Sequence, residues 1–134
     1  MIVIFCDTNK LWWVLKKYVN WHFSDDDFFV QLSKINKVYV NTIIVEELFY
    51  THNRSNSPIT KLQVHDFLKK IWCLIFSSRF PDDKYQIYVK DPNDAQILQD
   101  AVDVKANILL TYNTKDFLID KISQHFGIFV TNHI

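Results

Sequence analysis

The feature that most constrains the fold is an apolar run near the N-terminus that stops at a carboxylate. Residues 2–6 are continuously apolar and rich in β-branched side chains, and Asp7 follows them directly. Such a run predicts a strand covered on both faces, as in a parallel sheet. Because an unpaired carboxylate at the end of a buried strand is costly, a functional role explains Asp7 better than a structural one.

Strand and helix patterns alternate along the rest of the chain. We expect further strands over residues 38–40, 86–90, 108–110 and 128–130, and helices over 43–52, 60–76, 91–102 and 113–121. This alternation predicts an α/β fold, a three-layer α/β/α sandwich around a five-stranded parallel sheet. The length of 134 residues suits a single domain over 1–134.

Composition excludes several classes of function. Gly127 is the only glycine, which rules out the glycine-rich loops that cradle nucleotide phosphates. The 15 basic and 15 acidic residues balance, so only a local patch can attract nucleic acid. The sequence contains no signal-peptide pattern and no apolar run near the ~20 residues that span a bilayer. We therefore expect a soluble, cytoplasmic protein with no membrane contact.

Acidic residues recur where predicted strands end. Asp94, Asn113 and Asp116 lie just beyond predicted strands, as Asp7 does. The carboxyl ends of parallel strands form the working edge of such a sheet. Carboxylates without Cys or His beside them suit Mg²⁺ or Mn²⁺, and such an ion can activate a water and stabilise the charge that develops on a phosphodiester. This combination indicates nuclease chemistry.

Some acidic residues also have a structural explanation. Glu46 and Glu47 lie about 100° apart on a helix, so only one can face the cleft, and their apolar neighbours do not settle which. Asp91 is well placed to cap the helix that follows it. The spacing of Asn113 and Asp116 also fits a helix cap and its reciprocal partner.

Four segments, taken together, resemble the PIN domain. A strand runs into Asp-Thr-Asn at residues 5–9, and Glu-Leu ends the segment 45–48. An Asp-x-x-Ile-Leu-x-x-Ala helix start spans residues 94–101, and a strand leads into Thr-x-Asn-x-x-Asp-Phe at 111–117. Their order and spacing agree with the family over nearly the whole chain.

The resemblance implies a Mg²⁺- or Mn²⁺-dependent endoribonuclease that cleaves single-stranded RNA and leaves a 5′-phosphate. Position by position, it assigns the catalytic and metal-binding acids to Asp7, Glu47, Asp94 and Asp116. Asn113 stands where many relatives have Asp, and it would support the metal ligands without contacting the ion itself. Asn9 would orient a carboxylate or a water, or cap the first helix.

Partners follow from the same resemblance. Stand-alone PIN domains of this length resemble the toxins of toxin–antitoxin pairs. In addition to the RNA substrate, the expected partners are therefore a small antitoxin protein and a second copy of the chain in a homodimer. Lys10, Lys115 and Arg54 are the candidate phosphate contacts. The alternative is a catalytically degraded PIN-fold module that binds RNA or protein, suggested by Asn113 and the neutral charge. A phosphatase with Asp7 as nucleophile would need an acid where Asn9 stands.

Overall fold

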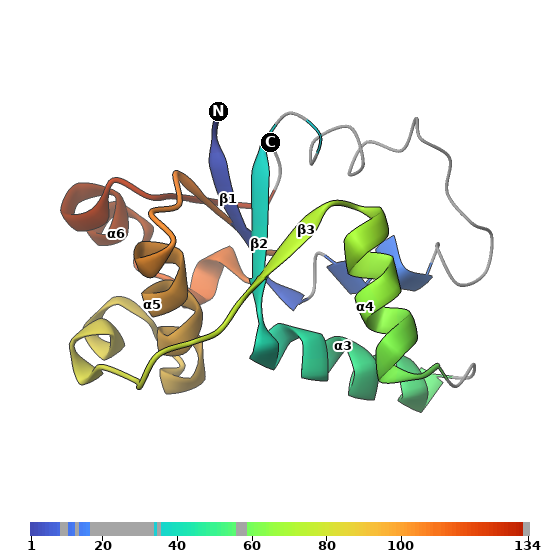
Figure 1. Cartoon of the computed structure of the whole chain (residues 1–134). Coiled ribbons are helices and arrows are strands. Elements are labelled where there is room, and N and C mark those ends of the chain that lie inside the picture. The colour runs from blue at the N-terminus through green and yellow to red at the C-terminus, as the bar shows by residue number, and fades with distance from the viewer. Residues whose placement is uncertain (9–10, 13, 17–33, 35, 56–58, 133–134) are drawn as a thin grey trace.

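The computed structural model describes residues 1–8, 11–12, 14–16, 34, 36–55 and 59–132, without the side chains of 52, 54 and 55. Its strands form a parallel five-stranded sheet in the order β3-β2-β1-β4-β5, flanked by helices, so the expected α/β class is confirmed (Figure 1). The strands are β1 (Val3–Cys6), β2 (Lys37–Asn41), β3 (Cys73–Phe76), β4 (Ile108–Leu110) and β5 (Phe129–Thr131). The α-helices are α3 (Thr42–Ser55), α4 (Lys61–Lys70), α5 (Ala95–Asp103) and α6 (Ile119–Phe126). The 3₁₀ turns are η1 (Asp83–Tyr88), η2 (Pro92–Asp94) and η3 (Thr114–Asp116).

Strand β1 lies at the centre of the sheet. It pairs in parallel with β2 on one side and β4 on the other, and Phe5 lies opposite both Tyr39 and Leu109. Ile4, Phe5 and Cys6 are all buried. Two covered faces explain why this strand is continuously apolar rather than alternating.

Helices cover both faces of the sheet. Helices α3 and α4 lie on one side and α5 and α6 on the other, as right-handed connections between parallel strands require (Figure 1). Leu48 of α3 and Phe67 of α4 are fully buried on the first side, and Leu98 of α5 and Ile122 of α6 on the second. The hydrophobic core therefore forms two layers with the sheet between them.

The strand order changes direction between β1 and β4. The chain moves outward from β1 to β2 and β3, then returns to place β4 on the opposite side of β1. In open α/β sheets, ligands bind beyond the carboxyl ends of the strands at such a switch point. Asp7 and Thr111 are the first residues beyond the two strands that border it.

The helix expected over residues 60–76 is wrong in its second half. Helix α4 ends at Lys70, Trp72 adopts a left-handed backbone with φ 62°, and Cys73–Phe76 form the edge strand β3. Leu62 and Trp72, two apolar residues of this segment, are 70% and 62% exposed. Periodicity alone cannot separate a helix from a short strand when an apolar run is continuous.

The strand expected over 86–90 is also wrong. Tyr85 and Tyr88 are the buried residues of η1, and their spacing of three matches the turn of a 3₁₀ helix. The helix expected over 113–121 is divided into η3 and α6, and α3 continues to Ser55 instead of ending at residue 52. The number of strands was thus predicted correctly with one wrong member.

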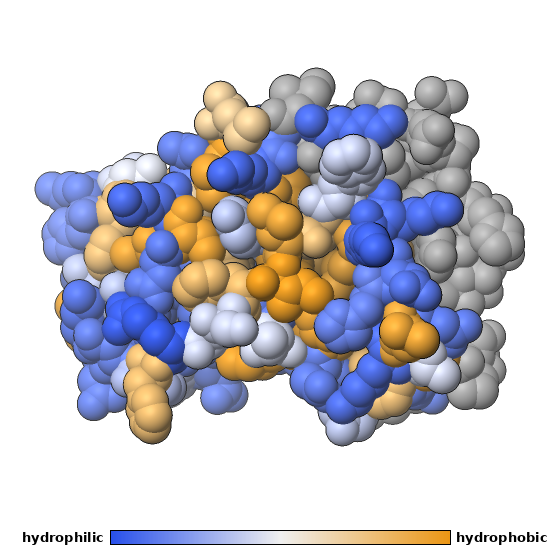
Figure 2. Space-filling model, viewed as in Figure 1, coloured by the Kyte–Doolittle hydropathy of each residue, from blue (hydrophilic) through white to orange (hydrophobic). Residues whose placement is uncertain are grey.

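The edge strand β3 leaves part of its apolar surface uncovered. Leu74 is 45% exposed and Ile75 is 38% exposed. Figure 2 shows apolar side chains over β3, in the middle of the face that is turned to the viewer.

Within the described part of the chain, none of the helices has the length and apolar character needed to cross a membrane.

Candidate functional site

Asp7 is held firmly at the switch point between β1 and β4. Its side chain is buried, with 5% of the residue exposed. The Thr8 N–H donates to Oδ1 of Asp7 at 2.7 Å, and the Thr111 hydroxyl donates to Oδ2 at 2.9 Å. The backbone is also fixed, because the Asp7 N–H donates to the Leu110 carbonyl at 2.9 Å. Each carboxylate oxygen keeps a lone pair for a further ligand.

Thr8 connects Asp7 to the second acid of the site. Its hydroxyl donates a short hydrogen bond to Oε2 of Glu47 on α3. The neighbouring Glu46 instead pairs with Lys61 at the start of α4, with the Lys61 Nζ 2.9 Å from Oε2. Glu47 therefore faces Asp7, and Glu46 faces the neighbouring helix.

Asp94 lies where η2 meets α5, among the other acids. Its carboxyl group is half-buried, and burial together with the charges of Asp7, Asp91, Asp116 and Glu47 raises its pKa from 3.8 to about 6. Because the effect of one charge on another falls off over short distances in water, these acids lie within range of the charge of Asp94. The acids expected at one edge of the sheet therefore share that region.

The same repulsion acts on Asp7. Burial raises its pKa, the hydrogen bonds from Thr111 and Thr8 oppose that rise, and the charge of Glu47 adds to it. Burial and a like charge both disfavour the ionised form of a carboxyl group. A bound cation would reverse the charge effect and favour ionised Asp7.

Asp91, Asn113 and Asp116 complete the edge. Asp91 caps η2, as expected, because its carboxylate accepts a hydrogen bond from the Asn93 N–H at 3.0 Å. Asn113 stands at the N-cap position of η3 but makes no side-chain cap hydrogen bond, so the structure does not support the alternative role of a side-chain cap. Its N–H instead donates to the Thr111 hydroxyl oxygen at 3.1 Å, which couples Asn113 to the hydrogen bond on Asp7.

The donor set suits a divalent cation through its chemistry rather than through a preformed shell. Among the described residues, no three His, Cys, Asp or Glu side chains are grouped closely enough to hold a metal ion as they stand. Asp7 is fixed, whereas Glu47 is exposed and Asp94 and Asp116 are only partly buried. All four offer carboxylate oxygens, the ligands that Mg²⁺ and Mn²⁺ prefer.

The candidate substrate contacts are placed unevenly. Lys115 is exposed in η3, directly before Asp116. Lys10 and Asn9 lie outside the described residues. Arg54 falls within α3, but its side chain lies outside the described part of the chain.

Two hydroxyl residues of the site did not emerge as site residues from the sequence. Thr8 bridges Asp7 and Glu47, and Thr111 fixes Asp7 from the neighbouring strand. Both are hydroxyl residues that closely follow a buried strand at the switch point. This position is the sequence signal that could have identified them as site residues. A rule that searches only for acids does not find them.

The chain was also compared with known proteins. No model of a known protein family matches it, and no curated protein sequence matches it significantly.

Proposed function

We propose that this chain is a Mg²⁺- or Mn²⁺-dependent endoribonuclease that hydrolyses phosphodiester bonds of single-stranded RNA. The observation that carries the proposal is geometric: Thr8 and Thr111 fix Asp7 at the switch point, and the Thr8 hydroxyl joins it to Glu47. The charges of Asp7, Asp116 and Glu47, together with burial, also raise the pKa of Asp94 to about 6. Like-charged groups gathered at the switch point of a parallel sheet are suited to a cation. The sequence resemblance to PIN domains supports the same reading.

Four carboxylates would bind the cation. Asp7, fixed by Thr8 and Thr111, provides the rigid ligand. Glu47 and Asp94 would supply carboxylates from helices on opposite faces of the sheet, and Asp116 would supply the fourth carboxylate. When bound, the cation supplies a water activated for attack and neutralises the charge that develops on the phosphate.

Partners are part of the proposal. The resemblance to toxins of toxin–antitoxin pairs suggests that a small antitoxin protein covers the acidic edge, and that two copies of the chain associate. A non-catalytic module that binds RNA through the same edge is the competing function, because Asn113 replaces an acid found in many PIN domains.

Cleavage of a short single-stranded RNA, with and without Mg²⁺ or Mn²⁺, tests the proposal. We expect cleavage only with metal, and a loss of roughly 1,000-fold in Asp7→Asn, equivalent to several kcal/mol of transition-state stabilisation. Asp66→Asn is the matched control, because Asp66 is exposed on α4, and it should retain wild-type activity. Cleavage in EDTA, or full activity in Asp7→Asn, would exclude the proposal, and RNA binding without cleavage would favour the non-catalytic module.

A further inference from the structure

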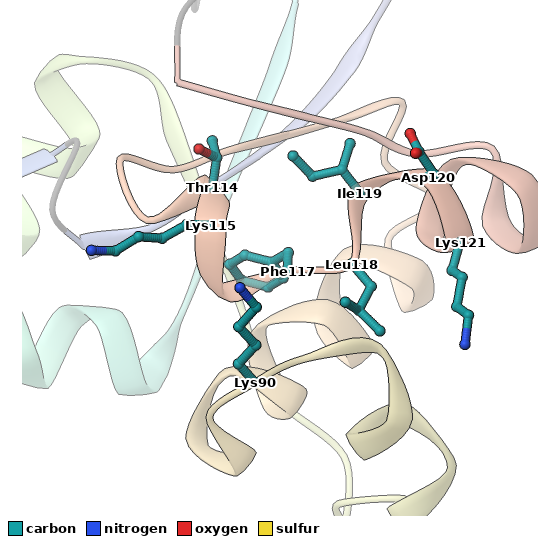
Figure 3. A pocket seen from close by; sticks show the side chains of 8 residues that line it. All are labelled: Lys90, Thr114, Lys115, Phe117, Leu118, Ile119, Asp120 and Lys121. Atoms are coloured by element: carbon teal, nitrogen blue, oxygen red, sulfur yellow. The ribbon is translucent and has the colours of Figure 1, made fainter.

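A cavity of about 450 Å³ lies between η3 and the start of α6 (Figure 3). Its walls come from η3, the first turn of α6 and Lys90, which directly follows Val89. Three lysines line it, Lys90, Lys115 and Lys121, together with the apolar side chains of Phe117, Leu118 and Ile119. The volume lies within the roughly 300–1,000 Å³ of pockets that hold small molecules.

Backbone contacts join the two walls of this cavity. Val89 and Phe117 form an antiparallel bridge. On either side of that bridge, the Lys90 N–H donates to the Asp116 carbonyl at 2.8 Å and the Leu118 N–H donates to the Tyr88 carbonyl at 2.9 Å. These bonds fix the backbone that carries Lys90 relative to η3 and α6.

The cavity concentrates positive charge in a chain whose net charge is zero. Among the described residues that line it, Asp120 is the one acid, against three lysines. Within the described part of the chain, none of these lysines forms an ion pair. In Figure 3 Lys90 lies between Lys115 and Lys121, and the three amines point in different directions from the walls of the cavity. Amines spread out in this way suit several phosphates of one chain better than one small anion.

The position of the cavity connects it to the acidic edge. Lys115 directly precedes Asp116, and Lys90 directly precedes Asp91. The charges of both acids act on Asp94. The acidic edge repels a polyanion, so a strand that reaches it has to be held by cations nearby. The lysines of the cavity are the described cations that lie closest to these acids along the chain.

We propose that this cavity holds the single-stranded RNA next to the bond that is cleaved, with its phosphates on Lys90, Lys115 and Lys121 and one unpaired base against Leu118 and Ile119. This inference rests on the proposed function, which it deepens by naming where the strand is held. A concave apolar wall accepts an unstacked base, whereas a duplex keeps its bases stacked. The backbone N–H groups at the start of α6, which no side chain caps, add donors on the same wall.

Fluorescence anisotropy with a short labelled single-stranded RNA in EDTA tests the inference. The double variant Lys90→Gln with Lys121→Gln should bind at least tenfold more weakly than wild type. Its log–log salt slope should be less steep by about 1.4, because roughly 0.7 is lost for each single-strand phosphate contact. The control is Lys69→Gln with Lys70→Gln, which removes the same charge from exposed residues at the end of α4 and should bind like wild type. Lys90→Arg with Lys121→Arg should also keep its affinity.

The binding assay in EDTA does not depend on cleavage, so it separates the two proposals. If wild type cleaves RNA but the Lys90 and Lys121 double variant binds it with unchanged affinity, the inference about the cavity fails and the nuclease proposal stands. If no cleavage is found but the double variant loses affinity, the cavity stands as an RNA site on a non-catalytic module. An acidic peptide that binds wild type more tightly than the RNA, and loses that affinity in the double variant, would make the cavity a protein site and overturn the inference.

Discussion

The hydroxyl of Thr8 donates a short hydrogen bond to the carboxylate of Glu47, joining the end of β1 to the middle of α3. Thr8 also donates its N–H to Asp7 at 2.7 Å, so one residue touches two of the proposed metal ligands. Groups that orient metal ligands affect metal affinity strongly even though they do not touch the ion.

Removing the Thr8 hydroxyl should therefore weaken metal binding more than it weakens the fold. In Thr8→Val we expect roughly 10- to 100-fold weaker Mn²⁺ binding by calorimetry, because Glu47 is no longer oriented. The free energy of unfolding should fall by only about 1 kcal/mol, because the exposed Glu47 carboxylate can be hydrated instead. Thr8→Ser keeps the hydroxyl and should restore most of the affinity. Equal metal affinity in Thr8→Val and wild type would contradict the assigned role.

Glu47 and its neighbour should respond differently to the same change. Glu47→Gln should lower RNA cleavage by roughly 100-fold or more, because a neutral amide is a poor ligand for a hard cation. Glu46→Gln should leave cleavage within about twofold and cost at most about 0.5 kcal/mol, because its pair with Lys61 is half exposed. The comparison uses initial cleavage rates under identical metal concentrations. A larger loss in Glu46→Gln than in Glu47→Gln would reverse the assignment.

The fold and the acids were predictable from the sequence to different degrees. The position of Asp7 at the sheet edge was predictable because a buried parallel strand leaves a clear apolar run that ends there. Strand β3 was not, because the run from Ile71 to Phe76 fits a helix as well as a strand. Whether Glu46 or Glu47 faces the site depends on contacts with residues outside α3. Thr8, from just beyond the end of β1, contacts Glu47, and Lys61, from the start of α4, contacts Glu46. Local patterns do not contain such contacts.

The pH dependence of stability should report on Asp94. Its pKa is raised from 3.8 to about 6 in the fold, so the folded state binds this proton more tightly than the unfolded chain does. Asp94 therefore costs no stability at pH values well below 4, and its cost grows as the pH rises to about 6 and is constant above that. After allowance for solvent screening of this half-exposed group, we expect a cost of about 1 kcal/mol.

Asp94→Asn removes that cost. In EDTA the variant should be more stable than wild type above pH 6 by about 1 kcal/mol, and the difference should disappear near pH 3. Denaturant unfolding across this pH range measures it, with Asp66→Asn as the control that should show no such trend. A variant that is less stable than wild type at neutral pH would contradict the crowding of charge around Asp94. Metal-supported activity of wild type should fall as the pH drops and Asp94 is protonated.

Asp100 connects α5 to α3, the helix that carries Glu47, through hydrogen bonds. Its carboxylate is fully buried and accepts hydrogen bonds from Asn41 and Ser78 on Oδ2 and from Gln96 on Oδ1, at 2.7 Å from Asn41 and 2.9 Å from Gln96. Asn41 in turn accepts the Ile44 N–H at 2.7 Å and so caps α3, the helix that carries Glu47. This network connects α5 to α3 through the end of β2.

Asp100→Asn should destabilise the protein by roughly 2–4 kcal/mol, because an amide N–H₂ on this fully buried side chain would face one of its three donors and leave that donor unsatisfied. Asp103→Asn is the matched control on the same helix. Its ion pair with Arg79 is partly exposed, so its loss should cost at most about 1 kcal/mol. Urea unfolding of both variants measures the difference. Similar values for the two variants would show that the Asp100 network contributes little to the fold.

We propose that Asp7, Glu47, Asp94 and Asp116 hold a divalent cation at the switch point between β1 and β4. Anomalous diffraction from crystals soaked in Mn²⁺ is the sharpest test of this claim, with Asp7→Asn crystals as the control. We predict a strong anomalous peak within bonding distance of carboxylate oxygens of Asp7 and Asp94, and its absence in Asp7→Asn. A saturating soak that gives no peak at this edge, or a peak held only by other residues, would contradict the claim.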